Sequence, residues 1–440
     1  MEHVSNISSI PIYTIIPFIL MLAGIATGPI LFHKLWHKNK NLLIFSLILG
    51  VPTSIYLITT GFSHNLTYQM IFDYIPFIVL LGSLFVISGG ILVTGFIPAK
   101  PHINTLFLAI GAILASFMGT TGAAMLLIRP LIVTNADRKY KVHTILFFIA
   151  IVANCGGLLT PLGDPPLFLL YLRDAPFTWF FQLLPEWAFI NVLLLGIYYL
   201  VDLFYYKKEN PEDLAKDNEL KLPIRLKGNL NFLWLIGVVL SVAFINKQYI
   251  PIIGENHYYG FMREGVIFIM AICSLIFTHN RTRKSNNFTW TPIIEVAFLF
   301  LGIFITMTPA LLFLEQNASK LGITTPDQFY YVTGTLSSFL DNAPTAVALH
   351  SLALGLQDQF ATLFEGIPLV AGIPESLLLA ISIGSVFFGS MTYIGNGPNF
   401  MVKSIAEENN IKMPHFFKYM YGFSLIILLP LFIIVCLLFI

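Results

Sequence analysis

Residues 157–170 read GLLTPLGDPPLFLL, a hydrophobic stretch in which Asp164 lies between a glycine and two prolines. Asp164 is the only formally charged residue between Val142 and Leu172. Proline lacks a backbone N–H and clashes with the preceding helical turn, so the sequence GDPP at 163–166 predicts a break in a helix. The stretch therefore combines a carboxylate with an interrupted helix in hydrophobic surroundings.

The composition of the whole chain is typical of a membrane protein. Of its 440 residues, 56% are hydrophobic and only 11% are charged, whereas soluble domains carry about 25% charged residues. A helix needs about 20 apolar residues to cross the hydrocarbon core, and such runs occur at 10–32, 41–60, 189–205 and 415–440. Short alternating segments, the pattern of a β-barrel, do not dominate the sequence. We therefore expect an all-α polytopic membrane protein.

Several other classes of protein are disfavoured. The N-terminal stretch MEHVSNISSIPIY lacks the basic region of a secretory signal, so the first apolar run is expected to remain as a helix. Cys155, Cys273 and Cys436 lie in apolar runs without metal-ligand spacing. The sequence carries no nucleotide-binding loop, zinc motif or nucleophile elbow. We expect no enzymatic activity, no cofactor and no nucleic-acid partner.

The distribution of Lys and Arg predicts the topology, because cytoplasmic loops are enriched in these residues. Basic residues flank 103–134 on both sides, so this segment should enter and leave from the cytoplasm as a re-entrant hairpin with the tip SFMGTTGAA at 116–124. The flanks of 328–355 are poor in basic residues, which predicts a second hairpin from the outer side, with the tip SFLDNAPTA at 338–346. The N-terminus is predicted to lie outside.

Three pairs of segments indicate an internal repeat. The hairpin tips align at a spacing of 222 residues, GLLTPLGDPPLFLL aligns with GSMTYIGNGPNFMV (389–402) at 232, and LGSLFVISGG (81–90) aligns with LGIFITMTPA (301–310) at 220. Because the predicted orientations of the hairpins are opposite, we expect an inverted-topology repeat, a signature of secondary transporters. The alternative is chance similarity between membrane sequences of low diversity.

This repeat predicts the organisation of the chain. N-terminal transmembrane helices occupy 1–69. The first repeat spans 70–206, with its hairpin at 103–134 and its broken helix at 142–172. A cytoplasmic linker at 207–229 leads to the second repeat at 230–440, with its hairpin at 328–355 and its broken helix at 375–403.

Polar residues at the tips and breaks are expected to meet near the membrane midplane. Oxygen-bearing side chains suit hard cations such as sodium, and a charge inside the bilayer must face the protein interior. We hypothesise that Asp341 is the primary exchange residue, holding either a proton or sodium, and that Asp164 is its partner. The candidate ion- and substrate-binding residues are Thr120, Thr121, Asn154, Thr160, Asp164, Asp341, Asn342, Thr345, Thr392 and Asn396.

Structural explanations compete with these roles. Asp341 and Asp164 also occupy positions that suit helix N-caps. Arg129 could extend to the interface, pair with an aspartate or bind an anionic substrate, and His350 is either an interfacial residue or a proton relay. The remaining acids near predicted helix ends are expected at the membrane interfaces: Asp73, Glu186, Asp202, Glu264 and Glu295.

From Phe77 to Lys418 the chain resembles the ion transporter superfamily, which includes NhaD-type sodium/proton antiporters, arsenite permeases, and citrate and dicarboxylate transporters. The resemblance is carried by SSFLDNAPTA (337–346), FMGTTGAAM (117–125), LTPLGDPPL (159–167) and TYIGNGPNFMVKSIAE (392–407). It is greatest to a bacterial branch of sodium/proton antiporters and citrate transporters. It implies a homodimer in the bacterial inner membrane that moves its transport domain by an elevator motion. The first tip lacks the Asn or Asp common in the superfamily, whereas the second has Asp341-Asn342, as in antiporters.

These observations favour a sodium/proton antiporter that exchanges cytoplasmic sodium for external protons. The alternative is a sodium- or proton-coupled citrate or dicarboxylate transporter, with Arg129, Thr120, Asn342 and Asn396 holding the substrate. A channel and a membrane-embedded enzyme are the other classes considered. Broken helices in an inverted repeat favour alternating access over a channel, and the deep residues lack a His/Glu pair at metal-binding spacing.

Overall fold

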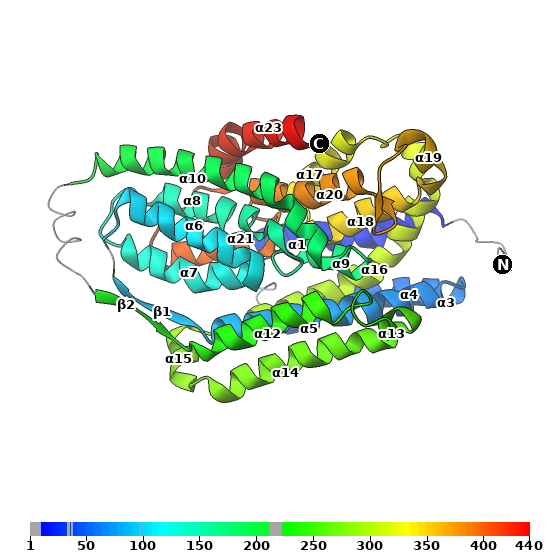
Figure 1. Cartoon of the computed structure of the whole chain (residues 1–440), viewed down its shortest axis with the longest axis horizontal. Coiled ribbons are helices and arrows are strands. Elements are labelled where there is room, and N and C mark those ends of the chain that lie inside the picture. Colours follow the sequence, from blue (N-terminus) through cyan, green and yellow to red (C-terminus); the bar gives the residue numbers. More distant parts are fainter. Residues whose placement is uncertain (1–9, 33–35, 37, 97, 211–221) are drawn as a thin grey trace.

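A computed structural model of the chain describes residues 10–32, 36, 38–96, 98–210 and 222–440. Of the predicted linker at 207–229, residues 211–221 lie outside the described residues, as does the start of the N-terminal segment. Most helices run along the longest axis of the molecule, with α12 and α14 along one edge and α10 and α23 along the opposite edge (Figure 1).

Eight helical stretches among the described residues are long and apolar enough to cross a membrane. They are Asn39–Thr59, Ser63–Gly89, Pro101–Met118, Val142–Leu159, Phe177–Tyr206, His257–Phe277, Thr291–Leu321 and Phe416–Phe439. Four shorter apolar stretches accompany them: Ile12–Gly28, Thr120–Thr134, Leu230–Phe244 and Glu375–Met391. The prediction of a helical, multi-pass membrane protein is therefore confirmed.

The elements fall into three groups that pack on one another. The first group contains η1 (Ile12–Ile15), α1 (Ile16–Leu31), α3 (Asn39–Thr59), α4 (Ser63–Tyr68), the π-helix η2 (Gln69–Tyr74), α5 (Ile75–Gly89), α12 (Leu230–Phe244), α13 (Ile252–Glu255), η5 (His257–Gly260), α14 (Phe261–Phe277), α15 (Asn280–Ser285) and α16 (Thr291–Leu321). Within it, α3 and α1 pack on α16, and α14 packs on both α5 and α12.

The second and third groups surround the two helix breaks. The second contains α6 (Pro101–Met118), α7 (Thr120–Thr134), α8 (Val142–Ile151), η3 (Cys155–Leu159), α9 (Pro165–Leu172), η4 (Phe177–Leu183) and α10 (Leu184–Tyr206). The third contains α17 (Pro326–Phe339), α18 (Asn342–Leu354), η6 (Gln357–Gln359), α19 (Phe360–Leu363), α20 (Glu375–Phe388), η7 (Gly389–Met391), α21 (Gly397–Glu408), α22 (Phe416–Tyr419), the π-helix η8 (Met420–Leu428) and α23 (Leu429–Phe439). The two groups interlock, because α9 packs on α18 and α21 packs on α7.

Two short antiparallel ribbons depart from the all-helical prediction. Strand β1 (Leu92–Phe96), which connects α5 to α6, pairs with β2 (Leu222–Lys227), which precedes α12. Strand β3 (Leu369–Val370) pairs with β4 (Ile373–Pro374) just before α20. The first ribbon therefore joins two chain connections that are far apart in the sequence.

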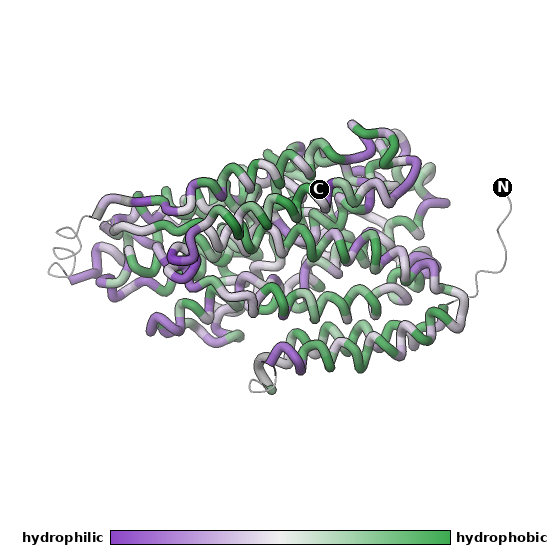
Figure 2. Tube along the Cα trace, turned by 90° about the horizontal axis from the view of Figure 1, so that it is seen from below, coloured by the Kyte–Doolittle hydropathy of each residue, from purple (hydrophilic) through white to green (hydrophobic). Residues whose placement is uncertain are grey.

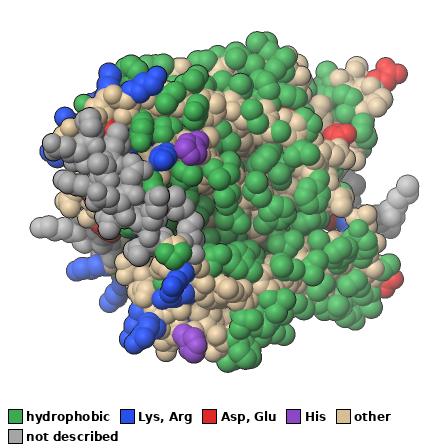
Figure 3. Space-filling view, turned by 60° about the vertical axis from the view of Figure 1, so that its left-hand side comes forward, with side chains coloured by type: hydrophobic (Ala, Val, Ile, Leu, Met, Phe, Trp, Pro, Cys, Tyr) green, Lys and Arg blue, Asp and Glu red, His purple; other side chains and the backbone are tan. Residues whose placement is uncertain are grey.

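The surface agrees with a membrane environment. Large apolar side chains such as Leu437, Ile276 and Val192 are 78%, 70% and 66% exposed, which suits contact with lipid tails. Hydrophobic residues follow the helices, and hydrophilic residues gather near the ends of the long axis (Figure 2). Figure 3 shows Lys and Arg side chains gathered at one end, with Asp and Glu near the other.

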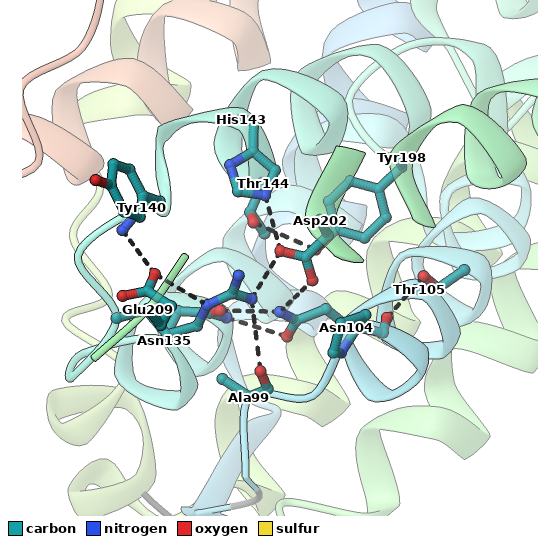
Figure 4. A network of polar contacts seen from close by, with 12 residues as sticks. Ala99, Asn104, Thr105, Asn135, Tyr140, His143, Thr144, Tyr198, Asp202 and Glu209 are labelled. Atoms are coloured by element: carbon teal, nitrogen blue, oxygen red, sulfur yellow. Dashed lines mark hydrogen bonds and ion pairs between the residues drawn. The ribbon is translucent and has the colours of Figure 1, made fainter. Parts of the chain in front are cut away.

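Buried acids form ion pairs at positions where the sequence predicted interfacial residues. Asp202 is fully buried, and its Oδ1 atom lies 2.7 Å from Arg138 Nη1 and 2.8 Å from His143 Nε2. Glu209 accepts hydrogen bonds from the N–H groups of Lys139 (3.0 Å) and Tyr140 (2.9 Å) in the same network (Figure 4). Partners from other elements thus enclose these groups, because an unpaired charge would be too costly to bury.

Two other acids show the same behaviour. Asp73 is 4% exposed and its Oδ2 lies 3.2 Å from Arg173 Nη2, while Glu264, also 4% exposed, has Oε1 2.5 Å from Arg263 Nη2. Glu186 is buried as well, at 6% exposed. The sequence did not predict that these side chains are enclosed by the protein, whereas their depth at the membrane interfaces stays a prediction.

Candidate functional site

The first helix break presents Asp164 to other elements. Helix α8 ends at Ile151, and α9 begins at Pro165, which with Pro166 fills its first two positions. Asp164 holds the N-cap position with extended backbone angles (φ −145°, ψ 144°), yet its side chain makes no capping hydrogen bond. Because both N–H donors of the first two positions are missing, the carboxylate is free to bind groups outside its own helix.

The second break has the same local structure. Helix α20 ends at Phe388, α21 begins at Gly397, and Asn396 adopts nearly the same N-cap angles (φ −150°, ψ 139°) without capping its helix. The Thr160 hydroxyl donates to the Ser116 carbonyl at the end of α6. The Thr392 hydroxyl likewise donates to the Ser338 carbonyl at the end of α17. Each break is thus fastened to the helix pair of its own group.

Glycines allow each break to fold tightly on itself. A Cβ atom at Gly163 would lie 2.0 Å from the Gly157 carbonyl oxygen, and one at Gly395 would lie 2.6 Å from the Gly389 oxygen. No side chain fits at such distances, and the obstacle is backbone rather than a movable side chain. These two glycine pairs explain why the sequence repeats Gly-x5-Gly at both breaks.

We expect Gly163→Ala to lower the free energy of unfolding by about 1–3 kcal/mol, because overpacking forces the backbone at Asp164 to shift. Thermal unfolding in detergent measures the change. Gly196→Ala in α10 is the matched control, since a Cβ there meets nothing within 4 Å and replacing a helical glycine by alanine stabilises a helix by up to ~1 kcal/mol. Equal stability of the two variants would contradict this account.

Four segments meet at the Asp164 carboxylate, which is 1% exposed. Its Oδ1 atom accepts hydrogen bonds from Thr120 Oγ1 at 2.7 Å and Asn396 Nδ2 at 3.1 Å. Its Oδ2 atom accepts one from Asn342 Nδ2 at 2.5 Å. These donors stand at the starts of α7, α21 and α18, respectively. The structure therefore brings together residues from both predicted tips and both predicted breaks.

The amides around Asp164 continue the network. Asn154 Oδ1 accepts a hydrogen bond from Asn396 Nδ2 at 3.1 Å, and Asn154 Nδ2 donates to Asn399 Oδ1 at 2.7 Å. The Asn342 Oδ1 atom is buried and has no hydrogen-bond partner among the described residues. An unpaired buried carbonyl oxygen next to a carboxylate is a suitable ligand for a small cation.

The other candidates lie at the edge of this network. Asp341 is only half-buried and accepts a hydrogen bond from the Ala343 N–H at 3.0 Å, so it caps α18. The Thr345 hydroxyl donates to the Asp341 carbonyl at 2.9 Å. Thr121 lines a pocket of about 70 Å³ together with Thr120, Gly163 and apolar residues of α5 and α16. The hydroxyl groups of Thr160 and Thr392 donate to the carbonyl oxygens described above rather than to Asp164.

Arg129 and His350 bind other groups. Arg129 Nη1 donates to the Asn286 carbonyl at 3.2 Å, and His350 Nε2 lies 2.9 Å from the Ala371 carbonyl. Neither contact involves the Asp164 cluster. Asn399, which is fully buried, was not among the predicted site residues. The only signal for it is its position just after Gly397-Pro398 in a stretch already rich in polar residues.

The arrangement can stabilise an ionised carboxylate, a proton on it, or a small cation beside it. Three neutral donors offset part of the cost of burying the charge. No group of three or more His, Cys, Asp or Glu side chains suited to a metal ion occurs in the described part of the chain. The cluster resembles the oxygen-rich surroundings preferred by hard cations.

A search among curated proteins finds no match for this chain. A protein-family model described as "putative citrate transport" matches residues 7–440. The match includes both helix breaks and the helix starts that surround Asp164. The chain, a multi-pass helical membrane protein, therefore belongs to this citrate-transport family.

Proposed function

We propose that the protein is a secondary active transporter whose coupling ion binds at the Asp164–Asp341 region, and that it exchanges cytoplasmic sodium for external protons. The observation that carries this proposal is the buried Asp164 carboxylate, which receives hydrogen bonds from three helix starts at once. A charge at membrane depth is costly and is a functional-site hypothesis by default. The family match supports the transport part of the proposal.

We further propose that the two helix pairs are re-entrant hairpins in an inverted repeat, as the sequence predicts for 70–206 and 230–440. The paired bonds of Thr160 with Ser116 and of Thr392 with Ser338 support this, because they join equivalent positions of the two aligned segments. The gathering of Lys and Arg at one end (Figure 3) supports placing that end on the cytoplasmic side of a bacterial inner membrane. The N-terminus would then lie outside.

In this mechanism Asp341 is the exchange residue and Asp164 its partner. Asp341 is half-buried and its carboxylate accepts only one hydrogen bond among those of the described residues, so an ion can reach it. Asp164 is enclosed and its carboxylate accepts three side-chain hydrogen bonds. Either a bound cation or a proton can neutralise the charge of a carboxylate, but one carboxylate cannot hold both at once. That competition couples sodium release to proton binding.

The helix starts around the site favour a cation over an anion. Helix N-termini bind anions through their free N–H groups, but Pro165, Pro166, Pro344 and Pro398 remove such donors from α9, α18 and α21. The loss of these donors suits a small cation better than a tricarboxylate.

Ion-coupled citrate or dicarboxylate transport is the second candidate, and the family match favours it. The predicted substrate contacts Thr120, Asn342 and Asn396 do lie together at Asp164. Arg129, the predicted cationic contact, instead donates to the Asn286 carbonyl. An anionic substrate would therefore depend on bound cations to neutralise the two aspartates.

A proteoliposome assay separates the two candidates. We expect a sodium pulse to change the internal pH, followed with a trapped pH-sensitive dye, in the absence of citrate. Empty liposomes and liposomes given potassium instead of sodium are the controls. A pH response that requires citrate would overturn antiport in favour of proton-coupled citrate transport, and the absence of a pH response without citrate would contradict antiport.

A further inference from the structure

The Asn154–Asn399 contact joins the two helix breaks directly. Asn154 follows the end of α8, whereas Asn399 lies in the first turn of α21, and both side chains are fully buried. Their amides meet at 2.7 Å between Asn154 Nδ2 and Asn399 Oδ1. Neither side chain contacts the Asp164 carboxylate through a hydrogen bond of the described structure, so any effect on it must pass through a neighbour.

The surrounding bonds fix the direction of both amides. Asn399 Nδ2 donates to the carbonyl oxygens of Gly389 (2.7 Å) and Thr392 (2.9 Å), so its Oδ1 atom must face Asn154. Asn154 Nδ2 is used by Asn399 and by the Ile149 carbonyl (2.8 Å), so its Oδ1 atom must face Asn396. Asn396 Nδ2 then donates to Asn154 Oδ1 and to Asp164 Oδ1, each at 3.1 Å, and also lies 3.2 Å from the Ala153 carbonyl oxygen.

The aligned positions offer a natural comparison. The spacing of 232 residues that aligns the two breaks places Val386 at the position of Asn154 and Leu167 at that of Asn399. Val386 and Leu167 are fully buried, and their helices α20 and α9 pack together. A break of this shape is thus compatible with apolar side chains at these positions. Of the two aligned pairs, the amide pair is the one that connects through Asn396 to Asp164 by hydrogen bonds.

We infer that Asn154 and Asn399 are positioning residues that hold the Asn396 amide against Asp164 and thereby set the affinity of the site for its cation. The inference rests on the proposed function. Partners that orient a direct ligand typically change metal affinity by about 10–100-fold when they are replaced. Removing both amides together avoids leaving one of them buried without its partner.

The test replaces the pair by the apolar pair that the chain itself uses, with Asn154→Val and Asn399→Leu in one protein. We expect the sodium concentration for half-maximal transport to rise by about tenfold or more, while the maximal rate and the melting temperature change less. Asn399→Ser, a milder change, is measured alongside and should raise this concentration by a smaller factor. It decides the question if the double variant does not fold.

Val386→Ala is the matched control, because it alters packing at the aligned position without touching the amides. It should leave the half-maximal sodium concentration unchanged. If the wild type is active and the double variant has an unchanged half-maximal sodium concentration, the inference is overturned while the proposed function stands. If the double variant is unfolded, an unchanged half-maximal concentration in Asn399→Ser has the same meaning. A wild-type protein without ion-dependent transport would contradict the proposed function, and the inference would fall with it.

Discussion

Replacing Asp341 by Asn is expected to abolish ion-driven transport while leaving the protein folded. The Asp341 carboxylate caps α18 by accepting the Ala343 N–H at 3.0 Å. Asparagine caps a helix about as well as aspartate, so the variant keeps this bond and the start of the helix. It loses only the charge that would bind sodium or a proton. Transport in proteoliposomes and the melting temperature in detergent are the two measurements.

Asp341→Ala completes this comparison, because it removes both the charge and the cap. Its transport should be lost as well, and its stability should fall by about 1 kcal/mol relative to Asp341→Asn. If Asp341→Asn transports normally and only Asp341→Ala is impaired, Asp341 is a helix cap and not an exchange residue. The pair of variants therefore separates the structural role from the proposed one.

Asp202→Ala is expected to lower the free energy of unfolding by about 3–5 kcal/mol, because it removes the nearer counter-charge of a buried guanidinium. The side chains of Arg138 and Asp202 are 1% and 0% exposed, and their closest atoms are 2.7 Å apart. Glu209 Oε1 lies farther from the guanidinium, 3.6 Å from Arg138 Nε, and also accepts two backbone N–H groups. Denaturant titration of the purified protein measures the loss.

Glu407→Ala provides the surface control for this prediction. Glu407 pairs with Lys403 at 2.8 Å within α21, but its side chain is 44% exposed. Exposed pairs of this spacing contribute about 0.3–0.5 kcal/mol. A loss in Asp202→Ala no larger than that of Glu407→Ala would show that water or rearrangement stabilises Arg138 without Asp202.

The sequence predicts those parts of the fold that depend on residues adjacent along the chain. Long apolar runs predict spanning helices, and Gly-Asp-Pro-Pro predicts the interruption before α9, because each depends on neighbouring residues. The β1–β2 ribbon was not predicted, since its strands lie about 130 residues apart and are only five and six residues long. The burial of Asp202 was also missed, because its partners come from α6, the α7–α8 connection and α8.

The candidate site shows the same division. Thr120, Asp164, Asn342 and Asn396 stand out in the sequence as polar residues beside breaks and tips, and the hydrogen bonds join all four. Asn399 did not stand out, because its partner Asn154 is 245 residues away. Arg129 was a plausible substrate contact by depth alone, yet the direction of its side chain depends on where Asn286 lies.

The β1–β2 ribbon has a mechanical consequence. Strand β1 leads out of α5 towards α6, and β2 leads into α12. Backbone hydrogen bonds between paired strands resist sliding, because a slip of one residue would turn every side chain to the opposite face. If the helices around the breaks shift relative to α5 and α12, the two paired strands cannot move independently. They would rotate together as one rigid ribbon about the ends of α5 and α12.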